Sequence, residues 1–160
     1  MTTHSGAGAG FEADRRPVVV GVDGSEKSKE ALTWAARWAA LSGVDLIAVI
    51  VWHYPTTLGW APPWPEGYDP AAEANRLLDD TLREVLGASP AVSATTRVLE
   101  GVAAPALVEL SKEASLIVVG SRGHGEFAGM LIGSVSEFLA GHSHCPVVII
   151  RDGNGASEAR

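Results

Sequence analysis

Segments typical of buried strands alternate with segments typical of helices along almost the whole chain. The strand-like runs are rich in Val, Ile and Leu, and most lack the polar alternation of strands with one solvated face. The expected strands span residues 17–22, 44–52, 92–99, 116–119 and 146–151, and the expected helices span residues 26–41, 70–86, 103–114 and 134–141. This order predicts an α/β fold with a mostly parallel sheet.

The order of the strands in this sheet decides where a ligand would bind. If the first three strands grow outward in one direction and the fourth returns beside the first, strands 17–22 and 116–119 flank a topological switch point. Ligands of such sheets bind outside the carboxyl ends of the strands. Asp23, Gly24 and Ser25 follow the first of these strands, and a glycine-rich loop follows the other. We therefore expect two segments far apart in the sequence to meet at one crevice.

The glycine-rich loop contains Gly120, two residues, Gly123, nine residues, and then Gly133 and Ser134. Glycines between a buried strand and a helix N-terminus let backbone N–H groups approach an anion closely. Arg122 adds a guanidinium, which matches phosphate oxygens well. The loop predicts a phosphate-binding site, although the same glycines could serve only tight turns.

Two of these polar residues have alternative roles as helix caps. Ser134 and Glu137 have the spacing of a capping box, in which Ser134 is the N-cap and Glu137 is the N3 residue. A cap satisfies only some of the free N–H groups, so phosphate binding could coexist with it. Asp23 could likewise contact a ligand or cap the helix that follows it.

Charge and composition exclude several other classes of protein. The net charge is −7 with three lysines, which argues against general binding to nucleic acid. No run of about 18 apolar residues predicts a transmembrane helix, and the first residues lack the apolar region of a signal peptide. We therefore expect a cytoplasmic protein with no membrane partner. Residues 1–16 and 152–160 are expected to be flexible tails around one domain, 17–151.

The sequence offers no convincing metal site. His142, His144 and Cys145 could supply at most three ligands, and no second cluster lies elsewhere in the sequence. We expect the two histidines to close the fourth helix and Cys145 to pack as a small apolar residue. The loop 53–69 is rich in proline and aromatic residues; it could form a lid, form a partner surface or pack on itself.

Two stretches resemble the universal stress protein family. GSRGHGEFAGMLIGSVSEFLAGHSHCPVVII carries the G-x2-G-x9-G-S/T pattern of its nucleotide-binding branch, and VVVGVDGS resembles its first strand and turn. The resemblance covers roughly residues 17–151 and suggests the single-domain form. It implies a five-stranded parallel sheet in the order 3-2-1-4-5 with helices on both faces, as in adenine-nucleotide alpha-hydrolase-like proteins. It also implies a stress-response role, a homodimer, and ATP or a related adenine nucleotide in the crevice.

The resemblance also implies roles for individual residues. Asp23 would contact the adenosine portion, and Val51 would lie by the base. The glycines, Ser134, Arg122 and Ser136 would surround the ribose and phosphates. The full set expected to bind nucleotide is Gly21, Asp23, Val51, Val119, Gly120, Arg122, Gly123, Gly133, Ser134, Val135 and Ser136.

Regulation by bound nucleotide is favoured over dedicated catalysis. The loop contains no lysine and no G-x4-G-K-S/T motif, and no residues form a convincing arrangement for phosphoryl transfer. We therefore predict no catalytic residue, with Mg²⁺ bound only through the nucleotide, within reach of Ser134. Slow ATP hydrolysis and a dimeric module that binds cyclic AMP are the alternatives. A homodimer through Val147–Ile150 is expected because an exposed apolar edge strand is usually covered or paired.

Overall fold

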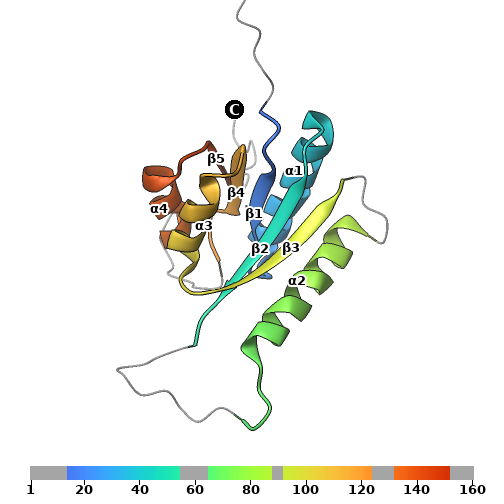
Figure 1. Cartoon of the computed structure of the whole chain (residues 1–160), viewed down its shortest axis with the longest axis vertical. Coiled ribbons are helices and arrows are strands. Elements are labelled where there is room, and N and C mark those ends of the chain that lie inside the picture. Colours follow the sequence, from blue (N-terminus) through green and yellow to red (C-terminus); the bar gives the residue numbers. More distant parts are fainter. Residues whose placement is uncertain (1–13, 55–64, 88–91, 124–131, 152–160) are drawn as a thin grey trace, which may run out of the picture.

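The computed structural model describes residues 14–54, 65–87, 92–123 and 132–151. The strands are β1 (Val18–Gly21), β2 (Leu46–Trp52), β3 (Ala94–Glu100), β4 (Leu116–Gly120) and β5 (Val147–Ile150). The helices are α1 (Glu26–Ser42), α2 (Pro70–Leu86), α3 (Ala103–Ser111) and α4 (Ser134–His142). All strand pairs are parallel, and the sheet order is β3-β2-β1-β4-β5 (Figure 1). The predicted fold class and strand order are therefore confirmed.

The sheet is the middle of three layers. Alternate residues of β1 point to opposite faces: Val18 and Val20 pack with α1 and α2, and Val19 packs with α3 and α4. Leu32 and Leu78 fill the first core, and Leu107 and Leu139 contribute to the second. Figure 1 shows α1 and α2 on one side of the sheet and α3 and α4 on the other. The carboxyl ends of β1 and β4 therefore open between the two helix layers.

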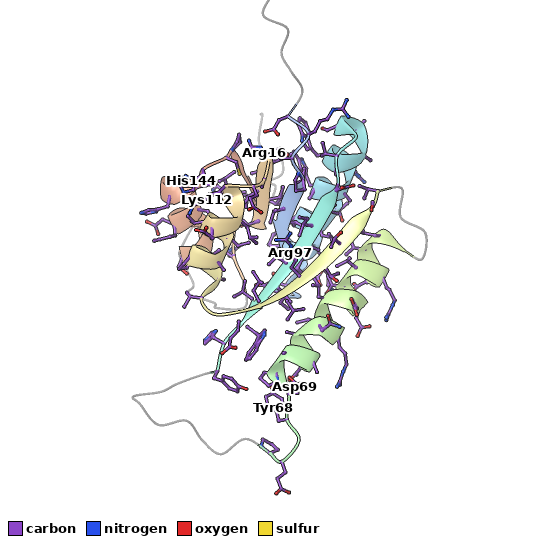
Figure 2. The ribbon with its side chains drawn as sticks, viewed as in Figure 1. Arg16, Tyr68, Asp69, Arg97, Lys112 and His144 are labelled. Atoms are coloured by element: carbon purple, nitrogen blue, oxygen red, sulfur yellow. The ribbon has the colours of Figure 1, made fainter. Side chains whose placement is uncertain are left out.

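The two edges of the sheet differ in character. β3 lies at one edge and exposes Thr95, Thr96 and Arg97, the last of which is labelled in Figure 2. β5 lies at the other edge and consists of four half-buried apolar residues, Val147–Ile150. A polar edge strand discourages pairing with another chain, whereas an apolar one favours it.

Side chains cap the N-termini of only two of the described helices. Ser25 caps α1 by accepting a hydrogen bond from the Ser28 N–H, and Gly43 ends this helix in the left-handed region at φ 67°. Asp69 caps α2 (Figure 2). At the N-caps of α3 and α4, which are Val102 and Gly133, no side chain makes a capping hydrogen bond.

The C-terminal end of α4 agrees in part with the prediction. His142 is the last helical residue; its Nδ1 lies 2.9 Å from the Phe138 carbonyl oxygen and its ring stacks on Phe138. The expectation that His144 also closes the helix is wrong, because the chain is already extended at Ser143. Cys145 is half-buried against the α3–α4 core, and burial raises the pKa of its thiol. Within the described ranges, no three His, Cys, Asp or Glu residues gather as potential metal ligands.

Several predictions concern residues that lie outside the described ranges. The tails 1–16 and 152–160 and the aromatic loop 53–69 fall largely there, so their predicted roles stay predictions. Among the helices that are described, none has the length and apolar character needed to cross a membrane.

Candidate functional site

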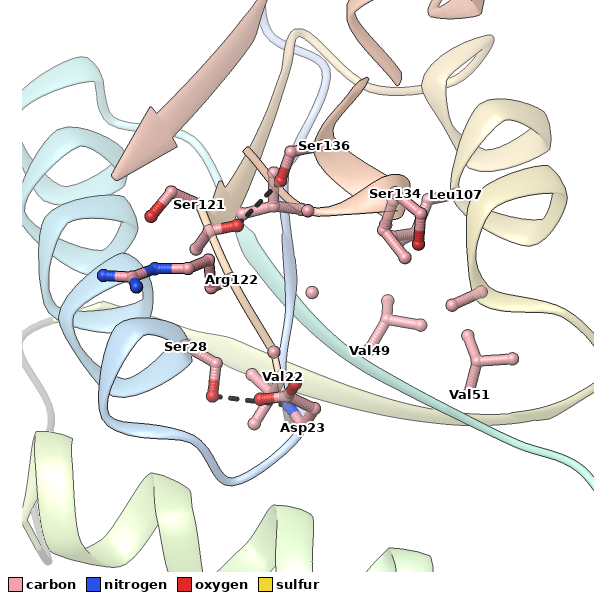
Figure 3. A pocket seen from close by; sticks show the side chains of 17 residues that line it. Val22, Asp23, Ser28, Val49, Val51, Leu107, Ser121, Arg122, Ser134 and Ser136 are labelled. Atoms are coloured by element: carbon pink, nitrogen blue, oxygen red, sulfur yellow. Dashed lines mark hydrogen bonds between the residues drawn. The ribbon is translucent and has the colours of Figure 1, made fainter. Parts of the chain in front are cut away.

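A cavity of about 290 Å³ opens at the carboxyl ends of β1 and β4, at the predicted switch point (Figure 3). Every residue of the expected nucleotide-binding set lines it. Six further residues line the cavity that were not in the expected nucleotide-binding set: Val22, Ser28, Val49, Ala103, Leu107 and Ser121. The structure thus brings together the turn after β1 and the glycine-rich loop after β4.

One wall of the cavity is apolar. Val49 and Val51 of β2, Leu107 of α3 and Val119 of β4 form it. Val49 precedes Val51 by two residues and therefore points to the same face of the sheet. Its place in the cavity could thus have been predicted from the sequence. Leu107 belongs to the inward stripe of α3. Such a wall suits a flat apolar group, for example an aromatic ring.

Another part of the cavity lining is the N-terminus of α4. Gly133 is the N-cap and has extended backbone angles, and its N–H donates to the Ser121 carbonyl oxygen at 2.6 Å. The predicted capping box is therefore wrong: the helix already includes Ser134, so Ser134 is N1, and the N-cap residue is Gly133, which has no side chain to make a capping hydrogen bond. The residues of the first helical turn, Ser134, Val135 and Ser136, line the cavity, and a helix N-terminus at this place favours an anion.

Ser136 has a structural bond within the cavity. Its hydroxyl donates to the Gly120 carbonyl oxygen at 2.8 Å, and its side chain is buried (Figure 3). This bond joins the first turn of α4 to the end of β4. Ser136 therefore holds the two sides of the cavity together, whatever it contributes to a ligand.

Asp23 does not cap α1, because Ser25 occupies that position. Its Oδ1 instead accepts hydrogen bonds from the Ser25 N–H at 2.9 Å and the Ser25 hydroxyl at 2.5 Å. Its Oδ2 lies against Gly123, close enough that a Cβ on that glycine would collide with it. The carboxylate of the β1 turn therefore contacts the glycine-rich loop directly.

The motif glycines are explained by close approach rather than by turn geometry. None of Gly120, Gly123 and Gly133 has a positive φ, so none of them is required by a left-handed backbone conformation. A Cβ on Gly120 would lie 2.8 Å from the Lys27 Cβ and 2.9 Å from the Lys27 carbonyl carbon. A Cβ on Gly133 would lie 3.2 Å from the Ser121 carbonyl oxygen.

Arg122 lies at the rim and is exposed. In Figure 3 its guanidinium points toward α1 and away from the apolar wall. Among the described lining residues it is the only one with a cationic side chain. Electrostatic attraction inside the cavity therefore depends mainly on the backbone dipoles of α4.

The chain is a doubly wound α/β domain with a crevice at its switch point, lined by apolar side chains and by a helix N-terminus, and this is where sheets of this kind bind their ligands. The model of the universal stress protein family matches residues 14–151, and the chain belongs to this family.

Curated relatives agree with this assignment. The chain is 39% identical over 146 residues to Universal stress protein Rv2623 of Mycobacterium tuberculosis, covering 84% of this chain and 47% of the relative. It is also 39% identical over 138 residues to a universal stress protein of Mycolicibacterium smegmatis, covering 86% of this chain and 46% of the relative. The chain thus spans about half the length of the curated relatives it matches.

A solved structure of similar fold is described as a universal stress protein in complex with cAMP. It is 33% identical to this chain, with a TM-score of 0.58, and the match covers 85% of this chain and 96% of that one.

Proposed function

We propose that this chain binds an adenine nucleotide, with ATP as the expected ligand, and acts as a cytoplasmic regulator in the stress response. The observation that carries the proposal is the cavity lined by the Asp23 turn and by the N-terminus of α4, whose N-cap residue is a glycine. The cAMP bound to the 33% identical structure supports an adenine nucleotide as the ligand class.

The lining of the cavity suggests how the nucleotide would lie. Val49, Val51 and Leu107 would contact the base, and the first turn of α4 would bind phosphate oxygens. The Asp23 carboxylate repels phosphate and accepts hydrogen bonds, so it would take a sugar hydroxyl or an amine. These preferences support one orientation of the nucleotide, with its base at the valines and its phosphates at α4.

A dedicated ATPase is the less favoured function. Efficient phosphoryl transfer needs cationic groups on the transferred phosphate, a held Mg²⁺ and a positioned nucleophile. The described lining residues offer Arg122 alone as a cation, and its side chain is directed toward α1. Bound Mg²⁺ would come with the nucleotide, near the Ser134 hydroxyl. Slow hydrolysis and a preference for cAMP remain the alternatives to test.

The proposal is tested by identifying and titrating the nucleotide. The purified protein is denatured and the released small molecules are identified by mass spectrometry; ATP and cAMP are then titrated into nucleotide-free protein by calorimetry. We expect binding of ATP in the micromolar range, and little ADP formed from bound ATP over an hour. If neither nucleotide binds in the high-micromolar range, the proposed function is wrong; tighter binding of cAMP would favour the alternative ligand.

We also propose a homodimer through the β5 edge. The carbonyl groups of Pro146 and Ile150 accept hydrogen bonds from the N–H groups of Ile117 in β4 and of Ser121 directly after it. By alternation, the backbone groups of Val147 and Ile149 therefore point to the free edge. Antiparallel pairing of two such edges closes on itself. Light scattering at micromolar concentration should give twice the mass of one chain, and Val147→Pro, which removes one outward N–H, should shift the mass toward one chain. A wild-type mass equal to one chain would contradict the proposal.

A further inference from the structure

Ser28 lines the cavity, but it is not among the residues proposed to contact the nucleotide. It is the third residue of α1 and only 3% exposed. Its hydroxyl donates to the Ser25 carbonyl oxygen at 2.9 Å and accepts the Asp23 N–H at 3.3 Å. Both hydroxyl bonds therefore go to the backbone of the turn that carries the Asp23 carboxylate.

Together these contacts form a closed network around the turn. The Ser28 N–H donates to Ser25 Oγ at 3.2 Å, and the Ser25 hydroxyl donates in turn to Asp23 Oδ1. Between Asp23 and Ser25, Gly24 has a φ of 82°, so the turn is tight. The network holds one carboxylate oxygen inside the turn and leaves Oδ2 against Gly123 of the glycine-rich loop.

We propose that Ser28 is a positioning residue, which fixes the direction of the Asp23 carboxylate and thereby raises the affinity for the nucleotide. This inference rests on the proposed function. A carboxylate oxygen held in one direction offers a ligand hydroxyl a ready-made acceptor, without the cost of ordering it on binding. Without the Ser28 hydroxyl, the Asp23 N–H loses its partner and the turn gains alternative conformations.

The chain offers a matched control for a purely structural effect. Ser111 is also fully buried, and its hydroxyl donates to the Val108 carbonyl oxygen at 2.6 Å and accepts the His144 N–H at 2.8 Å. It thus has the same hydrogen-bond pattern as Ser28, on the third helix and outside the cavity lining. Both Ser28→Ala and Ser111→Ala should lower the midpoint of thermal unfolding.

The two variants should differ in ligand affinity. Titration calorimetry should show ATP affinity about tenfold weaker in Ser28→Ala, equivalent to ~1.4 kcal/mol, and unchanged in Ser111→Ala. Ser28→Thr keeps the hydroxyl and should recover most of the affinity. If Ser28→Ala binds ATP as wild type does, or if both alanine variants lose affinity equally, the positioning role is wrong.

A double-mutant cycle tests whether Ser28 acts through Asp23. Because the two residues share one network, Ser28→Ala should cause no further loss of affinity in an Asp23→Ala background. Additive losses would overturn the positioning role even if ATP binding itself is confirmed. Failure of the wild-type chain to bind any adenine nucleotide would instead refute the proposed function, and this inference with it.

Discussion

Replacing Gly123 by valine is expected to weaken ATP binding by at least about a hundredfold, which corresponds to ~2.7 kcal/mol. A Cβ at this position would collide with Asp23 Oδ2, the oxygen that we assign to the ligand. The carboxylate would have to rotate away, and the valine methyl groups would enter the cavity. Titration calorimetry against the wild-type protein measures the loss.

The same substitution should leave the fold almost unchanged. Gly123 is exposed, its φ is not in the left-handed region, and the colliding atom belongs to a side chain rather than to the backbone. The midpoint of thermal unfolding should therefore stay close to that of the wild-type protein. Gly123→Ala should lose less affinity than Gly123→Val. Wild-type affinity in the valine variant would show that the glycine-rich loop does not bind the nucleotide.

Gly120→Ala, in contrast to Gly123→Val, should lower the free energy of unfolding, by about 1–3 kcal/mol. Its Cβ would lie 2.9 Å from the backbone carbonyl carbon of Lys27, in the first turn of α1. This collision can be relieved only if α1 or β4 moves. Both are packed in the core: Leu32 of α1 and Val118 of β4 are fully buried. Urea denaturation followed by circular dichroism measures the change.

Gly141→Ala is the control for that experiment. Gly141 lies in α4, and a Cβ there would meet no atom within 4 Å. Alanine favours helix over glycine by up to about 1 kcal/mol, so this variant should be as stable as the wild-type protein or slightly more stable. If Gly120→Ala unfolds at the wild-type urea concentration, α1 is not held against β4 as tightly as the distances indicate.

The fold was predictable because strands and helices each leave a regular pattern of apolar and polar residues in the sequence. Buried parallel strands appear as short apolar runs, and the polar residues of β3 marked it as an edge. The helix starts were less predictable, since each depends on one residue's backbone angles. Gly133 has extended backbone angles and is the N-cap, although serine, the residue type of Ser134, is more common than glycine at that position. Asp23 and Ser25 are both good caps by type, and Ser25 has the correct place relative to the first turn.

The cavity was predictable in outline and less so in detail. Residues after β1 and β4 were expected to meet because strand order places these ends side by side. Leu107 and Ser28 were missed for another reason: they reach the cavity from helices whose rotation about their axes depends on core packing. The direction of Arg122 could not be read from the sequence either, because it depends on which neighbours its long side chain meets.

The difference between the two sheet edges has a consequence for the size of any assembly. Pairing of two chains at β5 would join their sheets into one continuous sheet and leave a β3 strand at each outer end. Those ends carry Thr95, Thr96 and Arg97, which are exposed and polar. A third chain would find no apolar edge to extend. Growth by strand addition would therefore stop at two chains, which protects a protein with a strongly apolar edge strand from forming fibrils.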